Sequence, residues 1–542
     1  MSAPWTPDTG DGRYRNPVLF ADWSDPDVIR VGDDYWMTAS SFHRVPGLPI
    51  LHSRDLVGWR IVGHALSRLV PEEHYAVPRP GCGVWAPALR FHDGRFWIFY
   101  PDPDFGIYVI TADHPAGPWS PPRLILPGRG LIDPCPLWDA DGRAYLVHAW
   151  ARSRCGFNNK LFAYEFGPGF DAPPGNAVLL VDGDAIRGCR TLEGPKWYRR
   201  DGWYWLFAPG GGVAHGWQYA MRSRHVFGPY EPRIVLSQGE TPVNGPHQGA
   251  WVDDWFVHFQ DRGAFGRVVH LQPLRWNADG WPVIGDGGTP VPTHRKPAAP
   301  PAAPAPTAPP RTPTAPPRTP TAPNSTPAIP SRTPAIPPRT PAIPPRTPAS
   351  SDDFADGRPG PQWTWAGNPA QGWLLPAANG LRLACVPGDE DLRAVPHLLG
   401  QRLSGPRSRV ETSVRLRAPD GARAGLVVCG HAYAEIGLEQ RPGGQCLVLI
   451  VAEADGKPET TVSAPIGDAT TVRLAVTVGE DAVARFAADT GTGWRAIGRP
   501  FTATPGGWIG ATVGLVATGD GTGSADFGAV TVVAPGPLSW QP

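Results

Sequence analysis

Three carboxyl groups, an indole and an imidazole recur at one position of a repeated sequence pattern. Five polar turns each lead into an aromatic segment, at residues 33–36, 93–97, 141–145, 201–205 and 253–256. Eight residues before the first four turns, and six before the fifth, stand in order Asp25, Trp85, Asp133, Glu193 and His247. A repeat that holds this position at one radius would gather the five side chains around a single axis.

Three carboxyl groups in one pocket suit the cleavage of a glycosidic bond. One protonated carboxyl would protonate the leaving oxygen, and one carboxylate would activate a water molecule or attack the sugar. A third carboxylate near the acid would raise the pKa of that acid by like-charge repulsion. Acidic residues before Pro also form ordinary turns, but five positions in register favour a site.

The elements that must position these residues are short strands. Up to residue 294, apolar or aromatic segments alternate with Gly, Pro and Asp turns, and no segment keeps a helical period for long. The repeats are roughly 50 to 60 residues long, which is typical of propeller blades with four short strands each. Residues 1–294 are therefore predicted to form a five-bladed β-propeller, whose innermost strands would carry the five side chains to the axis. Pro or Gly after most of these positions would end regular pairing and free the side chain to point inward.

The composition changes abruptly after the predicted propeller. Residues 295–351 consist almost entirely of Pro, Ala, Thr and Arg, which predicts a disordered linker. At roughly 3.1 Å per residue, such a linker is long enough that the flanking domains need not touch. Residues 352–542 return to short apolar strands between turns, so the second domain is predicted to be a β-sandwich and the whole chain all-β. Its Trp363, Trp365 and Trp373 could form a sugar platform or pack in the core.

Composition also limits the partners and the compartment. The 49 basic and 49 acidic side chains balance, which argues against nucleic acid or an anionic membrane and favours a small, neutral oligosaccharide. The seven cysteines lie far apart without C-x-x-C spacing, so neither a disulfide framework nor a zinc site is predicted. Residues 1–14 lack the features of a signal peptide, so we expect a cytoplasmic protein unless a leader was removed or secretion takes another route. The oligomeric state is left open.

Several motifs resemble glycoside hydrolase family 43. They are the segments at 16–19, 30–35, 40–42, 46–50 and 52–59, with Val84-Trp-Ala-Pro87, Ile132-Asp-Pro134, Glu193-Gly-Pro195 and Gly266-Arg267. The resemblance spans about residues 15 to 285. The segment from Asp352 is similar to the concanavalin-like, jelly-roll domain that follows the propeller in β-xylosidases of this family.

The resemblance implies a role for each carboxyl group. Asp25 would be the general base that activates water, and Glu193 would be the general acid. Asp133 would orient the acid and tune its pKa. Asp22 and Asp27 are rival candidates for the base, and Asp25 is preferred because it alone keeps the eight-residue spacing and a following Pro.

The resemblance also implies substrate and metal contacts. Phe42 and Trp85 would form walls of the sugar subsite, and Arg267 would bind sugar hydroxyls unless it pairs with a carboxylate of the rim. His247 would help to hold a structural calcium at the propeller centre, largely through water. Because imidazole is a poor ligand for Ca²⁺, a buried structural histidine is the alternative.

Three functions remain open at this level. The first is an inverting exo-glycoside hydrolase that releases terminal β-D-xylose from xylo-oligosaccharides. The second is an α-L-arabinofuranosidase, or a bifunctional enzyme, acting on arabinose-bearing oligosaccharides. The third, from a different class, is a non-catalytic carbohydrate-binding or scaffolding propeller.

Overall fold

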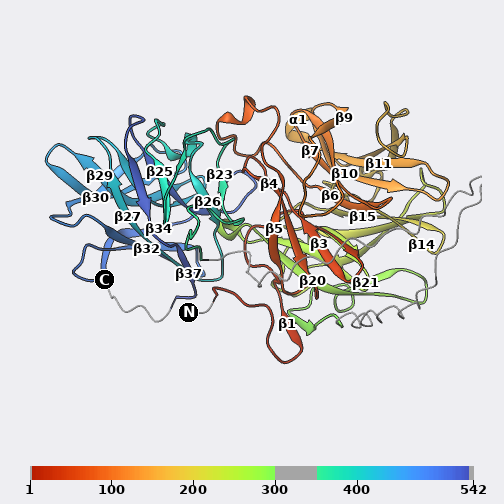
Figure 1. The fold of residues 1–542 in the computed structure, drawn as a ribbon. Coiled ribbons are helices and arrows are strands. Elements are labelled where there is room, and N and C mark those ends of the chain that lie inside the picture. Colours follow the sequence, from red (N-terminus) through yellow and green to blue (C-terminus); the bar gives the residue numbers. More distant parts are fainter. Residues whose placement is uncertain (1–2, 299–350, 536–542) are drawn as a thin grey trace, which may run out of the picture.

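The computed structural model describes residues 3–298 and 351–535, and it is built from two β domains that lie side by side (Figure 1). Five four-stranded sheets form a propeller, and two larger sheets form a sandwich. Within the described residues the only α-helix is the four-residue α1 (Arg152–Cys155). The predicted all-β fold class, with a five-bladed propeller followed by a sandwich, is confirmed.

Each blade is an antiparallel sheet whose four strands follow one another in sequence. Blade 1 consists of β2 (Asp27–Val31), β3 (Asp34–Thr38), β4 (Gly47–Ser53) and β5 (Arg60–Leu66). Blade 2 consists of β6 (Ala88–His92), β7 (Arg95–Asp102), β8 (Gly106–Ala112) and β9 (Arg123–Pro127). Blade 3 consists of β10 (Leu131–Trp138), β11 (Ala144–Trp150), β12 (Lys160–Phe166) and β13 (Val178–Asp182). Blade 4 consists of β14 (Lys196–Arg200), β15 (Trp203–Gly210), β16 (Trp217–Ser223) and β17 (Glu231–Ser237). Blade 5 consists of β18 (His247–Val252), β19 (Trp255–Asp261), β20 (Arg267–Trp276) and β21 (Pro282–Ile284).

The first strands of the blades face the propeller axis. Strand β2 contacts β6, β6 contacts β10, β10 contacts β14, and β18 contacts β2. The recurring position of the sequence repeat lies on these strands or up to three residues ahead of them, as predicted. The polar turns that follow are the tight connections to the second strand of each blade. The repeat therefore brings five side chains, one from each blade, to the same end of the axis.

The two ends of the propeller segment meet and close the ring. Strand β1 (Arg13–Arg15) pairs antiparallel with β22 (Thr293–Arg295). The Tyr14 hydroxyl, which is fully buried, donates to the carbonyl of Leu271 at 2.8 Å. Because these contacts join residues more than 250 positions apart, they bind the first blade to the last.

The second domain packs two antiparallel sheets face to face. The first sheet has the order β23 (Thr364–Trp365), β26 (Leu399–Arg402), β35 (Thr512–Thr518), β28 (Arg423–Cys429), β29 (Tyr433–Arg441), β30 (Gly444–Ala452) and β31 (Glu459–Pro465). The second has the order β24 (Leu374–Leu375), β25 (Leu381–Ala384), β36 (Ser524–Phe527), β27 (Ser408–Arg417), β32 (Val472–Val478), β33 (Val483–Asp489) and β34 (Arg495–Thr502), with β37 (Thr531–Val533) paired to β27. Strands such as β27 alternate buried and less buried residues, as expected when only one face of a sheet meets the core.

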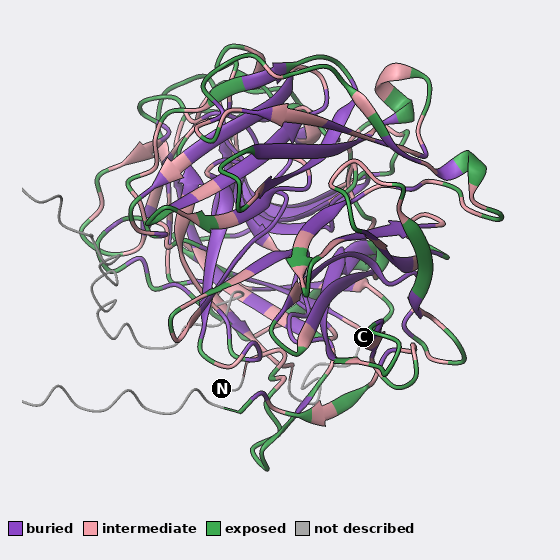
Figure 2. Ribbon diagram, turned by 90° about the vertical axis from the view of Figure 1, so that its right-hand side faces the viewer, coloured by how far each residue is buried: buried purple, intermediate pink, exposed green. Residues whose placement is uncertain are grey.

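The two domains are in contact, although the length of the linker does not require it. Val45 of the propeller and Trp365 of the sandwich exchange backbone hydrogen bonds of 3.0 and 2.6 Å. Phe20 and Phe265 of the propeller belong to the same apolar cluster as the sandwich core. In Figure 2 the buried strands fill the interior, and the exposed segments lie around the outside. The contact between the domains is thus apolar and hydrogen-bonded, like a domain core.

The three tryptophans considered as a sugar platform are core residues. Trp363, Trp365 and Trp373 are all buried in the cluster shared by the two domains. Almost all of the predicted linker, at residues 299–350, lies outside the described residues.

Candidate active site

All seven residues predicted for the site line a single cavity of about 340 Å³ at one end of the propeller axis. They are Asp25, Phe42, Trp85, Asp133, Glu193, His247 and Arg267. The three carboxyl groups come from blades 1, 3 and 4. The residues that carry them are more than 50 positions apart in the sequence. The repeat therefore brings the carboxyl groups together as its spacing predicted.

Unusual backbone conformations turn the acidic side chains toward this cavity. Asp25 and Asp133 have φ angles of 55° and 56°, in the left-handed region. The pairing of β10 with β11 shifts register between Ile132 and Cys135, on either side of Asp133. Such bulges re-aim a side chain out of the regular alternation of a strand, and Asp tolerates the left-handed region better than most residues.

Asp25 is held by three donors. The hydroxyls of Ser24 and Ser40 donate to its Oδ2 at 2.7 and 2.5 Å. Arg267 Nη1 lies 3.3 Å from Oδ1 and also donates to Ser24 Oγ at 2.6 Å. Only 5% of the Asp25 surface is exposed. Its carboxylate is therefore fixed in orientation, with Arg267 at once a partner of the carboxylate and a wall of the cavity.

The rival carboxyl groups serve the scaffold instead. Asp22 accepts the backbone N–H of Arg267 at 2.9 Å, and burial raises its pKa. Asp27 is fully buried, where it accepts the N–H of Leu89 at 2.6 Å and an N–H of Arg90 at 2.7 Å. Neither lines the cavity. Of the three candidates, only Asp25 can reach a bound sugar.

Asp133 lies deepest of the three carboxyl groups. It is 2% exposed, and its Oδ2 accepts the N–H of Gly194 at 2.7 Å and Nε2 of Gln248 at 3.1 Å. Burial, and then the negative charges of Glu193 and Asp25, raises the pKa of Asp133 to about 7. Asp133 therefore keeps a proton close to neutral pH, because burial disfavours its charged form and the neighbouring carboxylates repel it.

Glu193 is the most accessible of the three carboxyl groups, with 20% of its side chain exposed. Its Oε1 lies 2.8 Å from Nε2 of His247, whose ring is fully buried. The buried His247 ring thus holds the Glu193 carboxyl group in place at the cavity.

The surroundings of His247 bear on the predicted calcium site. The Nδ1 atom of His247 is buried without a hydrogen-bond partner, whereas Nε2 is used by Glu193. Across residues 3–298 and 351–535, no group of three or more His, Cys, Asp or Glu side chains is placed to hold a metal ion. A calcium ion here would need its oxygen ligands from water or from amide and carbonyl groups. Calcium thus stays a prediction, and no step proposed below uses it.

Aromatic rings form the walls of the cavity. The ring centroids of Phe42 and Trp85 lie 6.2 Å apart. A third ring, Trp508, lies 6.1 Å from Trp85 and 5.9 Å from the Arg267 guanidinium carbon. Trp508 belongs to the sandwich domain and is 50% exposed. The second domain therefore completes the wall of a cavity whose floor is made by the propeller.

Family models match both domains. The model for glycosyl hydrolases family 43 matches residues 14–282, and the model for the beta xylosidase C-terminal concanavalin A-like domain matches residues 351–532. A protein of Xylanibacter ruminicola that carries the name of a beta-xylosidase is 37% identical over 444 residues, which cover 80% of this chain and 73% of that protein. The chain belongs to glycoside hydrolase family 43.

Other members of family 43 give the same result. A non-reducing end alpha-L-arabinofuranosidase of Bacteroides ovatus is 33% identical over 318 residues, covering 53% of this chain and 56% of that protein. A solved structure described as Bacteroides ovatus Xyloglucan PUL GH43B superposes with a TM-score of 0.77 at 25% identity, covering 96% of this chain and 99% of that one. The chain is accordingly a glycoside hydrolase. No helix in the described part of this family 43 enzyme has both the length and the apolar character needed to cross a membrane.

Sequence reasoning missed several residues of the family 43 site. Ser40 belongs to the motif at 40–42, and Gln248 directly follows His247. Their neighbours in the sequence could therefore have indicated both residues. Trp508 gave no such signal. Its loop, 505–510, fits because Gly507 and Gly510 carry no Cβ, which would lie 2.9 Å from Gly81 N and 2.7 Å from Gly266 N.

Proposed function

We propose that this family 43 enzyme is an inverting exo-glycoside hydrolase that releases terminal β-D-xylose from xylo-oligosaccharides. The observation that carries the proposal is the meeting of three carboxyl groups with the rings of one Phe and three Trp residues in one cavity. Its volume of about 340 Å³ lies near the lower end of ligand pockets, which run from about 300 to 1,000 Å³. A pocket of this size favours one terminal sugar over an extended chain.

In this proposal Asp25 is the general base. Its carboxylate accepts hydrogen bonds from Ser24, Ser40 and Arg267. These donors keep the carboxylate from rotating. A water molecule between Asp25 and the anomeric carbon would lose its proton to this carboxylate as it attacks. Arg267 also lines the cavity, and a guanidinium there can donate to sugar hydroxyls.

Glu193 is the proposed general acid. Its greater exposure places a carboxyl group where a leaving oxygen can accept a proton, and His247 orients that group. Asp133 is too deeply buried for this task. Burial, and then the charge of Glu193, raises the pKa of Asp133, and this interaction supports a different role, in which Asp133 orients and tunes the acid.

Two alternative functions are an α-L-arabinofuranosidase and a sugar-binding propeller without catalytic activity. One relative carries the name of an alpha-L-arabinofuranosidase, and arabinofuranose presents hydroxyls similar to those of xylose in a different ring. Initial rates on an aryl β-xyloside and an aryl α-L-arabinofuranoside would rank the two activities. A purely sugar-binding propeller would not require the acidic positions, which are all filled here.

The decisive experiment is hydrolysis of xylobiose followed by NMR. We expect xylose to be released with its newly formed anomer inverted relative to the β-linkage. Asp25→Asn and Glu193→Gln should each lower kcat by about 10²- to 10⁴-fold while the Tm changes little. Asp201→Asn, in the exposed turn of blade 4, is the matched control and should keep normal turnover. Retention of configuration, or near-normal rates in either variant, would contradict the proposed mechanism.

The compartment remains a separate prediction. We propose that the enzyme works in the cytoplasm, where imported short xylo-oligosaccharides would be available to it. Fractionation of native cells with antibodies to the enzyme would test it, and recovery in the medium would contradict it.

A further inference from the structure

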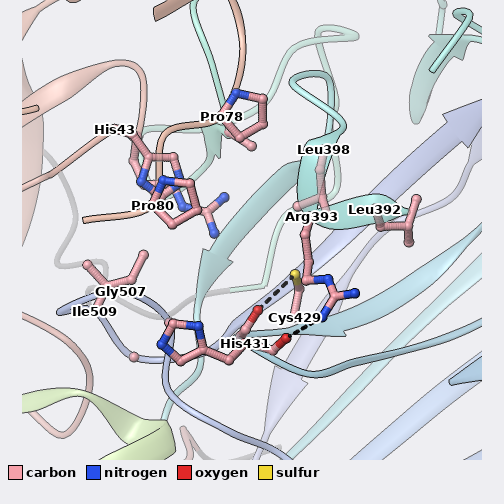
Figure 3. Close-up of a pocket in the computed structure, with 15 residues that line it drawn as sticks. His43, Pro78, Pro80, Leu392, Arg393, Leu398, Cys429, His431, Gly507 and Ile509 are labelled. Atoms are coloured by element: carbon pink, nitrogen blue, oxygen red, sulfur yellow. Dashed lines mark hydrogen bonds between the residues drawn. The ribbon is translucent and has the colours of Figure 1, made fainter. Parts of the chain in front are cut away.

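A second, smaller cavity is lined by residues of both domains (Figure 3). Its volume is about 70 Å³, compared with about 340 Å³ for the catalytic cavity, so it is too small for a sugar ring. The propeller contributes His43, Arg44 and Pro80, and the sandwich contributes Cys429 and Ile509. Any occupant of this cavity would touch both domains.

Arg44 has donors in this cavity without a protein partner. Its Nη2 donates to Thr512 Oγ1 at 3.1 Å, whereas the buried Nε and Nη1 atoms donate to no acceptor within the described residues. The other arginine of the lining, Arg393, is already satisfied by Asp391 and by backbone carbonyls. Buried N–H groups without an acceptor are costly, so these two donors of Arg44 call for an acceptor in the cavity.

The charge around Arg44 favours an anion over water as that acceptor. Arg402 also lies at this interface, partly buried, and the positive charge of Arg44 acts on it. The carboxylate of Asp22 acts on both arginines. Burial lowers the pKa of Arg402 only to about 10, so this side chain stays charged at pH 7. Burial holds the pKa of His43 far below its usual range, so that ring is neutral. Two partly buried positive charges thus lie near the single carboxylate of Asp22.

We propose that the cavity binds one small monovalent anion, such as chloride, on Nε and Nη1 of Arg44. The anion accepts the two unused N–H groups and neutralises the excess positive charge of the interface. Because the cavity is lined by 506–507 and 509–510 on either side of Trp508, the bound anion also braces the loop that carries Trp508 to the catalytic cavity. This site is independent of the proposed substrate and mechanism.

Bromide locates such a site directly. Crystals of the full chain grown in sodium bromide should show an anomalous peak within hydrogen-bond distance of Arg44 Nε and Nη1. Water density without an anomalous peak at this position would overturn the proposal.

The same site should be visible in solution as stabilisation. At equal ionic strength, chloride should raise the Tm of the full chain above its value in sodium gluconate along a saturable curve, by about 2 °C or more. Arg44→Met should abolish this difference. Arg68→Met is the matched control, because Arg68 also joins the domains, through the carbonyl of Pro369 at 2.8 Å, but lies outside the cavity. A chloride effect that survives in Arg44→Met, or is missing in the native chain, would contradict the site. If Arg44→Met does not fold, the bromide crystal decides.

Discussion

Replacing the deepest carboxyl group should make the enzyme more stable and less active. Burial, and then the charges of Glu193 and Asp25, raise the pKa of Asp133 from 3.8 to about 7, and Asp133→Asn removes this buried charge. The backbone N–H of Gly194 and the amide of Gln248 can still donate to the oxygen of Asn. The substitution therefore removes the repulsion and keeps the hydrogen bonds.

The size and pH dependence of this gain follow from the pKa. Below about pH 4, Asp133 is protonated in both the folded and the unfolded chain, and its ionisation costs nothing. Between about pH 4 and pH 7 the unfolded chain ionises first, so the folded state loses stability as the pH rises. At about 1.4 kcal/mol per pKa unit, a rise from 3.8 to about 7 costs the folded state about 4 kcal/mol at pH 8. Asp133→Asn should recover a few kcal/mol at pH 8 and almost none at pH 4.

The assay is urea unfolding followed by tryptophan fluorescence at pH 4, 6 and 8, with kcat on xylobiose measured in parallel. Asp141→Asn is the matched control, because Asp141 lies in the exposed turn of the same blade and Arg143 lowers its pKa. It should give no stability gain at pH 8. If Asp133→Asn is no more stable than the native chain at pH 8, or if its gain is the same at every pH, the ionisation of Asp133 does not destabilise the folded enzyme. Unchanged kcat would separately refute a role for Asp133 in catalysis.

Three further outcomes are expected. Trp508→Ala should raise KM for xylobiose about tenfold by opening the wall of the cavity, whereas Trp494→Ala, elsewhere in the sandwich, should leave KM unchanged; equal effects would refute the contribution of the loop. Gly194→Ala should lower both Tm and kcat, because a Cβ would lie 2.3 Å from Gln248 Oε1; Gly142→Ala, which shares a positive φ but has nothing within 4 Å, should cost only the backbone strain, and equal losses would refute the steric reason. Chelation with EDTA should lower Tm and activity if calcium occupies the axis, and added calcium should restore both; no change in either would end the calcium prediction.

Local pattern was enough to predict the architecture of this chain. The spacing of polar turns and aromatic segments reports strand length and turn position, which are local properties. Because a propeller repeats one unit around an axis, the same spacing also predicted that Asp25, Asp133 and Glu193 would converge. The seven predicted residues consequently line one cavity.

Other features depended on contacts between distant parts of the chain. Asp22, Asp25 and Asp27 lie within six residues of one another, and in the sequence only the spacing and the following Pro favour Asp25. The folded chain shows what the other carboxyl groups do instead, because Asp27 meets Leu89 and Arg90 of the next blade while Asp25 faces the cavity. Direction of a side chain depends on backbone twist, which the spacing of residues does not report.

The repeat by itself thus determined the fold class, the blades and the carboxyl groups at the axis, since each follows from a period in the sequence. Tertiary structure alone decided that the domains touch, that Trp508 closes the cavity, and that two donors of Arg44 are buried and unused. Trp508 reaches Trp85 across more than 400 residues. Such a contact is set by the packing of two complete domains, and no local pattern on either side encodes its partner.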